Sequence, residues 1–341
     1  MPPENSIAEP STRTSLPRRV RFAVLYSLYV AGVVFLGWKL YGWFVYDVPL
    51  TRTSNADDVW GLYYPELWKA GAVDSDSKPG DGRLDVLLLG ASVLEQMTEP
   101  LERELKQRHG DNVRLYNLSK SAHTTRDSRQ KLTRLKDKHF DVIVVYHGIN
   151  DVRMNCVPKA DYRDDYSHCA WYASFEQKLQ HGAISVRGVT SDLKASIGLG
   201  PPDVEDRKYG RDIKTAAAFQ ANLEAIVSSA RERKIPVVLM TFATYLPPDY
   251  TEERFRAGKL DYGEGQFQLP TEVWGHPPDV LAAVIVHNAV IRDVATRFDN
   301  VRFVDQEKLL PRNGKVFADV CHLTPHGCRL FAKNLARFGV R

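Results

Sequence analysis

Apolar residues gather in two kinds of stretch along this chain, and each kind predicts a different element. The first is one long run near the start: residues 22–38 contain no charged side chain, and apolar character resumes after Lys39 as far as Tyr46. A run of this length is sufficient for one helix to span a bilayer. The second kind consists of short apolar stretches that alternate with segments of helical periodicity from residue 84 onward.

This alternation predicts a parallel α/β sheet. We expect strands at residues 84–89, 113–118, 142–146, 236–241 and 301–304. We expect helices near residues 94–109, 124–138, 216–233, 278–298 and 325–338. Strands that alternate with helices in this way build a doubly wound parallel sheet, here of about five strands, with helices on both faces. In such sheets the chemistry gathers at the carboxyl ends of the strands.

The pattern divides the chain into four regions. Residues 1–19 are polar and rich in proline, which is typical of a disordered tail. Residues 20–46 form the predicted transmembrane helix, and residues 47–82 a juxtamembrane segment and linker. Residues 83–341 then form the predicted globular domain.

Two long insertions interrupt the alternation, at residues 152–213 and 243–277. Insertions of this length usually have a function, and both follow strand ends. The second is rich in aromatic residues, which either wall a substrate site and stack on sugar rings or pack the insertion's own small core. Both interpretations stay open.

Charged residues around the apolar run predict its orientation. Arginines at positions 13, 18, 19 and 21 precede the run, whereas only Arg52 follows it closely. The positive-inside rule therefore predicts a cytoplasmic N-terminus and an exported, periplasmic globular domain. The alternatives are a cleaved signal peptide and a buried core helix. The aromatic cluster at the end of the run favours a signal anchor, and the nearest small-residue cleavage site, at residues 54–56, lies too far beyond the run.

Overall charge indicates no partner. The chain has 46 basic and 42 acidic residues, without the basic stripe that nucleic-acid binding requires. We therefore expect no nucleic-acid partner, and the sequence makes no prediction of oligomeric state.

Four cysteines lie in the region expected to be exported, where disulfides form. The most local pairing joins Cys156 to Cys169 and Cys321 to Cys328; the alternative is four free thiols. No Cys-x-x-Cys pair is present, so we expect neither a zinc ribbon nor a thioredoxin-like redox site.

Polar residues follow four of the expected strands. They are Ser92, the loop 117–125, the segment Gly148 to Asp151, and a turn that contains Asp319 and His322. A parallel sheet brings these strand ends to one edge. Ser92 also fits a helix N-cap, because Glu95 three residues later completes a capping-box pattern.

Together these residues match the needs of a serine nucleophile, which requires a base, a group that orients the base, and donors for an oxyanion. His322 is the expected base and Asp319 the group that orients it. The backbone N–H groups of Ser92 and Ala122 and the side-chain amide of Asn150 are the expected oxyanion donors.

In these four blocks the chain resembles the SGNH (GDSL-type) hydrolase superfamily. Gly90-Ala-Ser92 is similar to the nucleophile block, residues 117–125 to the second block, Gly148-Ile-Asn150-Asp151 to Gly-x-Asn-Asp, and Asp319-Val-Cys-His322 to Asp-x-x-His. The resemblance extends from about residue 84 to the C-terminus. It implies a three-layer flavodoxin-like fold and ester hydrolysis through Ser92, His322 and Asp319 without a metal or organic cofactor.

Two residues depart from the family pattern. Ala91 replaces the usual aspartate beside the nucleophile, and Ala122 replaces the glycine whose N–H helps to form the oxyanion hole. If the backbone at Ala122 has positive φ, its methyl group carries a strain cost. Gly90, Gly148 and Asp151 are expected to support the site, while His123 and His147 flank it. His322 and His326 do not form a metal motif, because Pro325 lies between them and no glutamate follows His322.

The expected function is a membrane-anchored, extracytoplasmic serine esterase that acts on an acyl ester of an envelope glycan, with O-acetyl as the expected acyl group. Lipid or lysophospholipid acyl hydrolysis and glycan O-acyltransfer remain alternatives. An alternative of another class is a non-catalytic, tethered glycan-binding or assembly module.

Overall fold

The computed structural model describes residues 18–45, 49–52, 56–181, 183–185 and 201–340 of the chain. The chain divides into two compact units. The first unit comprises residues 1–52 and 183–190, and the second comprises residues 53–182 and 191–341.

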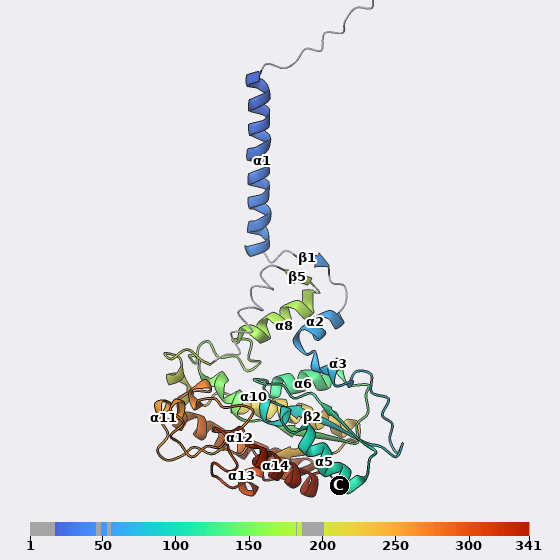
Figure 1. Ribbon diagram of the computed structural model, residues 1–341. Coiled ribbons are helices and arrows are strands. Elements are labelled where there is room, and N and C mark those ends of the chain that lie inside the picture. Colours follow the sequence, from blue (N-terminus) through green and yellow to red (C-terminus); the bar gives the residue numbers. More distant parts are fainter. Residues whose placement is uncertain (1–17, 46–48, 53–55, 182, 186–200, 341) are drawn as a thin grey trace, which may run out of the picture. The chain divides into compact units, whose positions relative to one another are not determined.

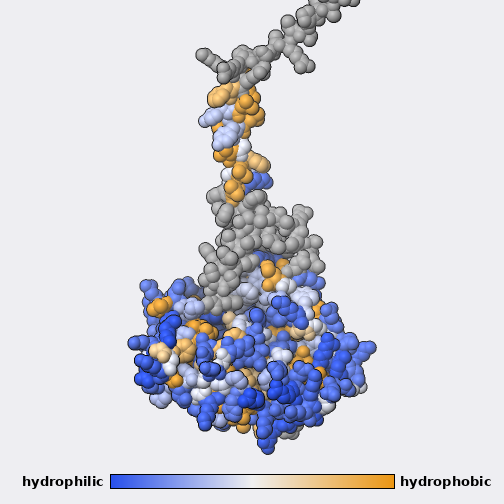
Figure 2. Space-filling model, viewed as in Figure 1, coloured by the Kyte–Doolittle hydropathy of each residue, from blue (hydrophilic) through white to orange (hydrophobic). Residues whose placement is uncertain are grey.

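The first unit contains one long apolar helix, α1 (Arg18–Val45), and a small antiparallel pair of strands, β1 (Pro49–Arg52) and β5 (Ala183–Ser185). All residues of the apolar segment Phe22–Leu40 are exposed. At 1.5 Å per residue this segment is about 28 Å long, close to the thickness of a bilayer core. It is the one candidate membrane span among the described residues, and a signal sequence has the same properties. Figure 2 shows the hydrophobic surface along this helix.

The second unit is built around the predicted parallel sheet, which is confirmed. Five strands form it, in the order β3-β2-β4-β6-β7, and all neighbouring pairs are parallel. The strands are β2 (Leu84–Gly90), β3 (Val113–Asn117), β4 (Val142–Tyr146), β6 (Val237–Met240) and β7 (Val301–Val304). Strands β2, β4 and β6 are buried almost throughout, as expected for a sheet covered on both faces.

Alternate residues of the strands face two separate hydrophobic cores. On one face Val86 and Val144 pack with α5 (Thr98–His109) and α14 (Pro325–Phe338). On the other face Leu87 and Val145 pack with α6 (Thr125–Arg134) and α10 (Ala216–Glu232). Figure 1 shows these two helix pairs on opposite sides of the sheet. Helix α12 (Pro277–Arg297) contributes side chains to both cores, which completes a three-layer fold.

The expected linker region contains core residues. Helices α2 (Ala56–Tyr63) and α3 (Glu66–Lys69) bury Trp60 and Leu67 in the second core, and Tyr64 between these helices is buried there too. There Phe175 of α8 (Ala170–His181) packs edge-on against Trp60, with ring centroids 5.1 Å apart. Part of the segment that precedes the sheet therefore belongs to the second unit's core.

Shorter elements connect these helices and strands. They are α4 (Ser92–Glu95), α7 (Ile149–Val152), η1 (Arg153–Asn155), η2 (Arg207–Arg211), α11 (Glu252–Arg256), η3 (Thr271–Val273) and α13 (Gln306–Leu309). The helix expected at residues 94–109 is in fact two helices, α4 and α5, because the chain turns between Gln96 and Met97. Helix α14 begins where expected: Pro325 occupies its first turn, and the Thr324 hydroxyl accepts a hydrogen bond from the N–H of Gly327.

The two expected disulfides are wrong, because all four cysteines are free thiols. The Cys156 sulfur lies 3.6 Å from the carbonyl oxygen of Trp274, whereas Cys169 packs in a separate aromatic cluster. The Cys321 sulfur lies 3.7 Å from Nδ1 of His322, whereas Cys328 points toward Gln96 at 3.4 Å. The cysteines of each expected pair are close in the sequence, but their sulfur atoms lie in different surroundings. Cys328 belongs to the first turns of α14, whereas Cys321 lies in the turn before that helix.

Candidate active site

The end of β2 places Ser92 at the carboxyl edge of the sheet, where α4 begins. Gly90 makes this turn feasible, because a Cβ atom there would lie 2.9 Å from the Cβ of Leu94 and 3.0 Å from the carbonyl oxygen of Tyr146. Any side chain at residue 90 would therefore displace either α4 or β4. Ser92 itself is 8% exposed.

A tight turn between Phe317 and Thr324 holds Asp319 and His322 together. The Asp319 carboxylate accepts hydrogen bonds at Oδ1 from the backbone N–H groups of Cys321 and His322, at 2.9 and 2.7 Å. Its other oxygen, Oδ2, lies 2.6 Å from Nδ1 of His322 and accepts a further bond of 2.8 Å from the N–H of Leu269. A carboxylate with all these donors around it is held in one orientation, and it keeps the proton of the imidazole on Nδ1.

The other ring nitrogen of His322 faces Ser92. Nε2 lies 2.7 Å from the Ser92 Oγ, so a continuous chain of hydrogen bonds joins the serine hydroxyl, the imidazole and the carboxylate. His322 is 1% exposed and Asp319 is fully buried, so water does not compete for these bonds. With Nδ1 protonated, Nε2 is the acceptor and the hydroxyl is the donor. This arrangement can remove a proton from Oγ.

The expected N-cap role of Ser92 is wrong. Ala91 is the N-cap residue of α4, with extended backbone angles, and Ser92 is the first residue of the helix. The Glu95 carboxylate does not return to Ser92; it accepts hydrogen bonds from the N–H and hydroxyl of Ser121 and from Lys120. The Ser92 hydroxyl is therefore directed to His322 and does not cap the helix.

Ala122 adopts the left-handed conformation, with φ of 69°. Such backbone angles cost a residue with a side chain about 1–2 kcal/mol relative to glycine. The loop is held on both sides: Glu95 binds the neighbouring Ser121, and the guanidinium of Arg153 donates a 3.0 Å hydrogen bond to the Ala122 carbonyl oxygen. These contacts stabilise a conformation that the methyl group disfavours.

Asn150 lies at the start of α7, directly after the close approach of Gly148 to Phe242. A Cβ atom at residue 148 would lie 2.6 Å from the Phe242 side chain. The side-chain amide of Asn150 is held at both ends: Nδ2 donates to the His123 carbonyl oxygen at 3.0 Å, and Oδ1 accepts from Nε1 of Trp274 at 2.8 Å.

Asp151 is fully buried beside this amide and accepts hydrogen bonds from Thr125 and Tyr166. The Thr125 hydroxyl donates at 2.5 Å and the Tyr166 hydroxyl at 3.1 Å. Burial raises the pKa of Asp151 to about 7, although the bonds from Thr125 lower it. Asp151 therefore connects α7 to the start of α6 and to the first insertion.

His123 and His147, expected to flank the site, are both buried in a polar cluster next to it. Nδ1 of His123 accepts a hydrogen bond from Nζ of Lys131 at 2.7 Å, and Nε2 of His147 lies 2.7 Å from the Ser128 hydroxyl. Burial, with a smaller contribution from the charge of Lys131, lowers the pKa of each histidine to about 3. Both imidazoles are thus neutral at ordinary pH and are oriented by the protein.

Sequence reasoning missed three contacts that the second insertion makes with the site. The ring centroid of Phe267 lies 5.2 Å from that of His322, Leu269 donates its N–H to Asp319, and Trp274 donates to Asn150. The aromatic richness of the insertion was visible in the sequence. The sequence did not show which aromatic ring contacts which site residue, because no local pattern links the insertion to β4 or to the Asp319 turn.

One group of side chains among the described residues has the spacing of metal ligands. One ligand atom each from Asp319, Cys321 and His322 lies within 4.8 Å of the others. In this site, however, the imidazole nitrogens are already engaged with Asp319 and Ser92, and burial holds the pKa of the Cys321 thiol well above its usual value. The donor set therefore suits a hydrogen-bond chain better than a cation.

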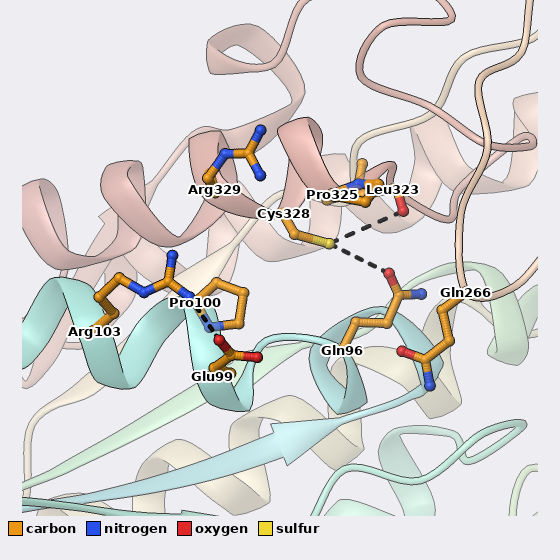
Figure 3. Close-up of a pocket in the computed structure, with 9 residues that line it drawn as sticks. All are labelled: Gln96, Glu99, Pro100, Arg103, Gln266, Leu323, Pro325, Cys328 and Arg329. Atoms are coloured by element: carbon orange, nitrogen blue, oxygen red, sulfur yellow. Dashed lines mark hydrogen bonds and ion pairs between the residues drawn. The ribbon is translucent and has the colours of Figure 1, made fainter.

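Two pockets lie beside the chain that follows Ser92, and neither is lined by Ser92 or His322. Figure 3 shows the first, a cavity of about 330 Å³ in which the Cys328 thiol points toward Gln96 and the Leu323 carbonyl. Its lining residues are Gln96, Glu99, Pro100, Arg103, Gln266, Leu323, Pro325, Cys328 and Arg329. The second, of about 220 Å³, is lined by Pro65, Glu66, Lys69, Glu95, Thr98, Asn117, Ser119 and Lys120. Charged and amide side chains are prominent in both.

Comparison with known families decides the class of this protein. The GDSL-like lipase/acylhydrolase family matches residues 90–330, which include all four motif blocks. The chain belongs to this family. It is accordingly a carboxylic ester hydrolase, and the alternative of a non-catalytic binding module is set aside.

Solved structures similar to this GDSL-family chain include other acylhydrolases. A lipase/acylhydrolase from Enterococcus faecalis has 16% identity and a TM-score of 0.41, with 74% of this chain and 94% of that chain covered. A GDSL-like lipase from Bacteroides thetaiotaomicron has 14% identity and a TM-score of 0.43, with 81% and 97% covered. An acetylxylan esterase from Geobacillus stearothermophilus has 14% identity and a TM-score of 0.43, with 76% and 96% covered. Among curated proteins, no sequence matches this chain significantly.

Proposed function

We propose that this GDSL-family hydrolase is a membrane-anchored serine esterase in which Ser92, His322 and Asp319 form the catalytic triad. The observation that carries the proposal is the buried hydrogen-bond chain from the Ser92 hydroxyl through His322 to Asp319, with links of 2.7 and 2.6 Å. A nucleophile, a base and an orienting carboxylate within hydrogen-bond distance are the requirements for acyl transfer through serine.

In the first half of the reaction, Ser92 Oγ attacks the ester carbonyl carbon while Nε2 of His322 takes the hydroxyl proton. Asp319 holds the imidazole in the correct tautomer and stabilises its positive charge. The tetrahedral intermediate then collapses: the bond to the leaving alcohol breaks, the alcohol takes the proton from Nε2, and the acyl group stays on Oγ. In the second half, His322 deprotonates a water molecule that attacks this acyl-enzyme; the bond between Oγ and the acyl carbon then breaks, Oγ takes the proton back from Nε2, and the acid is released. The reaction needs neither a metal nor an organic cofactor.

The proposed oxyanion donors are the backbone N–H groups of Ser92 and Ala122 and the side chain of Asn150. Neither of the two N–H groups donates a hydrogen bond to another residue within the part of the chain that the structure describes. Gly90 and Gly148 support the site by allowing close backbone approach, and Asp151 supports it by tying α7 to α6. Preorganised donors of this kind stabilise developing negative charge without reorganisation during the reaction.

For the substrate, we propose an acyl ester of an envelope glycan, with acetyl as the acyl group. Phe267 of the second insertion supports a sugar as the alcohol portion, because this half-buried ring lies beside His322, with ring centroids 5.2 Å apart, where an aromatic side chain can stack on a sugar.

For the location, we propose that α1 is a signal anchor, with the N-terminus in the cytoplasm and the catalytic unit in the periplasm. The fully exposed apolar segment Phe22–Leu40 supports this, as does the bias of arginines toward the N-terminal side. In bacterial cells the full chain should resist carbonate extraction from membranes, dissolve in detergent, and be degraded by protease added to spheroplasts. Release of a shortened, soluble chain would instead identify a cleaved signal sequence.

The triad is tested by replacing Ser92 with Ala in the full chain. Hydrolysis of p-nitrophenyl acetate should fall roughly 10⁴-fold or more, and labelling by a fluorophosphonate probe should disappear. Ser119→Ala is the matched control, since Ser119 is equally buried in the neighbouring loop and should keep labelling and activity. A Ser92→Ala protein with full activity would overturn the proposal.

Acetate release from acetylated polysaccharide, compared with acyl release from a lysophospholipid and acetyl transfer to sugar hydroxyls, distinguishes the substrate classes.

A further inference from the structure

The orientation of the Asn150 amide decides whether this side chain can donate a hydrogen bond to the oxyanion. Its amide makes two protein contacts, Nδ2 to the His123 carbonyl at 3.0 Å and Oδ1 from the Trp274 indole at 2.8 Å. An amide nitrogen has two hydrogens and only one is used in the first contact. The second N–H is therefore available to an oxyanion, provided that the amide stays in this orientation.

Trp274 determines that orientation. An indole N–H is a donor and never an acceptor, so it can form a hydrogen bond only with the amide oxygen. If the amide rotated by 180°, its NH₂ group would face the indole N–H and its oxygen would face the His123 carbonyl. Both contacts would then be repulsive. Inside a buried site such mismatched pairs cost far more than they do in water.

The indole is itself held firmly. Trp274 is 2% exposed, and its backbone N–H donates to Thr271 at 3.0 Å. Earlier in the same insertion, the Thr271 N–H donates to the Tyr250 hydroxyl at 2.8 Å and the Leu269 N–H to Asp319 at 2.8 Å. One short segment thus contacts both the carboxylate of the proposed triad and the amide of the proposed oxyanion hole.

We propose that Trp274 is a positioning residue for the esterase reaction: its indole N–H locks the Asn150 amide so that the second Nδ2 hydrogen points to the oxyanion. This inference rests on the proposed function. Because Trp274 is buried and acts through Asn150, its effect is expected on the rate of the chemical step. The second insertion then positions a group that takes part in catalysis, and does not only line the substrate site.

The first variant for the test is Trp274→Phe, which keeps an aromatic ring and removes the donor. With p-nitrophenyl acetate and the full chain in detergent, we expect kcat to fall about 10- to 100-fold with KM changed less than about 3-fold. This is less than the roughly 10²- to 10³-fold loss expected for Asn150→Ala, since removal of an oxyanion donor has that effect. Trp60→Phe, at a buried tryptophan of the other core, is the matched control and should leave kcat unchanged.

The decisive measurement is a double-mutant cycle. If Trp274 acts through Asn150, Trp274→Phe should change kcat less than about 2-fold in an Asn150→Ala background. Multiplicative losses would show that the two side chains act independently and would overturn the inference. An active Ser92→Ala protein, by contrast, would overturn the proposed function itself, so the two failures are distinguishable.

A second variant guards against poor folding of Trp274→Phe. Benzothienylalanine at position 274, introduced by nonsense suppression, keeps the bicyclic shape and replaces only the N–H by sulfur. We expect an unchanged unfolding temperature with the same loss in kcat and in the rate of fluorophosphonate labelling. Wild-type kcat in this variant would overturn the inference, because the donor would then be unnecessary.

Discussion

Two buried histidines of this hydrolase lie near the same strand ends but have opposite neighbours. Nδ1 of His322 faces the Asp319 carboxylate at 2.6 Å, whereas Nδ1 of His123 accepts a hydrogen bond from the Lys131 ammonium at 2.7 Å. A carboxylate stabilises a protonated imidazole, and an ammonium group prevents its formation. Burial alone therefore does not set the role of a histidine here: both imidazoles are buried, and they differ in the charged group that lies against Nδ1.

The cluster around His123 also differs in how it is built. Nζ of Lys131 is fully buried, lies 2.7 Å from Oε1 of Glu66, and donates to the Leu118 carbonyl at 2.6 Å. Glu66 belongs to α3, ahead of the sheet and outside the family match, which begins at residue 90. The Asp319–His322 pair lies within one turn of chain, whereas this cluster joins α3 to the distant segment 118–131. We therefore expect the first region to govern activity and the second to govern stability.

The largest expected effect separates the two histidines by activity. His322→Ala should lower kcat for p-nitrophenyl acetate roughly 10⁴-fold or more, because no base then remains for Ser92. His123→Asn should lower it by less than about 10-fold, since the amide oxygen can still accept from Lys131. Equal losses in the two variants would contradict the comparison.

The next effect concerns stability. Lys131→Met leaves the buried Glu66 carboxylate without its partner, which should lower the free energy of unfolding by about 3–5 kcal/mol. Urea denaturation of the purified chain measures this change. The double variant Glu66→Gln/Lys131→Met should recover much of the loss. Lys106→Met is the matched control: it breaks a surface pair with Glu102, and its effect should be close to zero because solvent screens that pair.

A smaller effect concerns how the free energy of unfolding depends on pH. The pKa of His147 in the same cluster is lowered to about 3 by burial, below its value of about 6.5 in an unfolded chain. The unfolded state then binds more protons, so stability is lost as pH falls from about 6.5 toward 3. Between pH 6.5 and 5 this histidine should contribute about 2 kcal/mol of the decrease. His147→Gln should show a shallower decrease in unfolding free energy over this range. An unchanged slope would show that His147 is already charged in the folded state.

The smallest expected effect is that of reduction. Because the cysteines are free, dithiothreitol should change neither the unfolding temperature nor kcat, even though Cys321 lies beside His322. Thermal unfolding and p-nitrophenyl acetate hydrolysis, measured with and without reductant, check this. A fall of several degrees on reduction would indicate that a bridge stabilises the protein.

Much of the fold was predictable because its signals are local. Short, nearly uninterrupted apolar strands alternate with helical segments. A strand that is buried on both faces is apolar at almost every position, so its sequence is easy to recognise. The same holds for part of the candidate site. Ser92 directly follows such a strand, and Asp319 and His322 are close enough in the chain for one turn to bring them together.

Other features depended on contacts that no local pattern contains. Ser92 and Glu95 fit a capping box, but the tertiary fold gives the serine hydroxyl to His322 and the carboxylate to Ser121. Neighbouring cysteines suggested bridges, but their sulfur atoms point into different surroundings. In both cases the side chain had several possible partners in the sequence, and the tertiary fold determined which group it contacts.

Local signals were enough to predict the parallel sheet, the apolar N-terminal helix and the polar residues at the strand ends, because periodicity and motif spacing act within a few residues. Tertiary packing was needed to bring Glu66 to the Lys131 ammonium beside His123, to hold Ala122 at positive φ, and to bring the Trp274 indole to Asn150. Glu66 and Lys131 are 65 positions apart in the chain and Asn150 and Trp274 are 124 apart, so no local pattern contains these contacts and packing of the whole domain selects them.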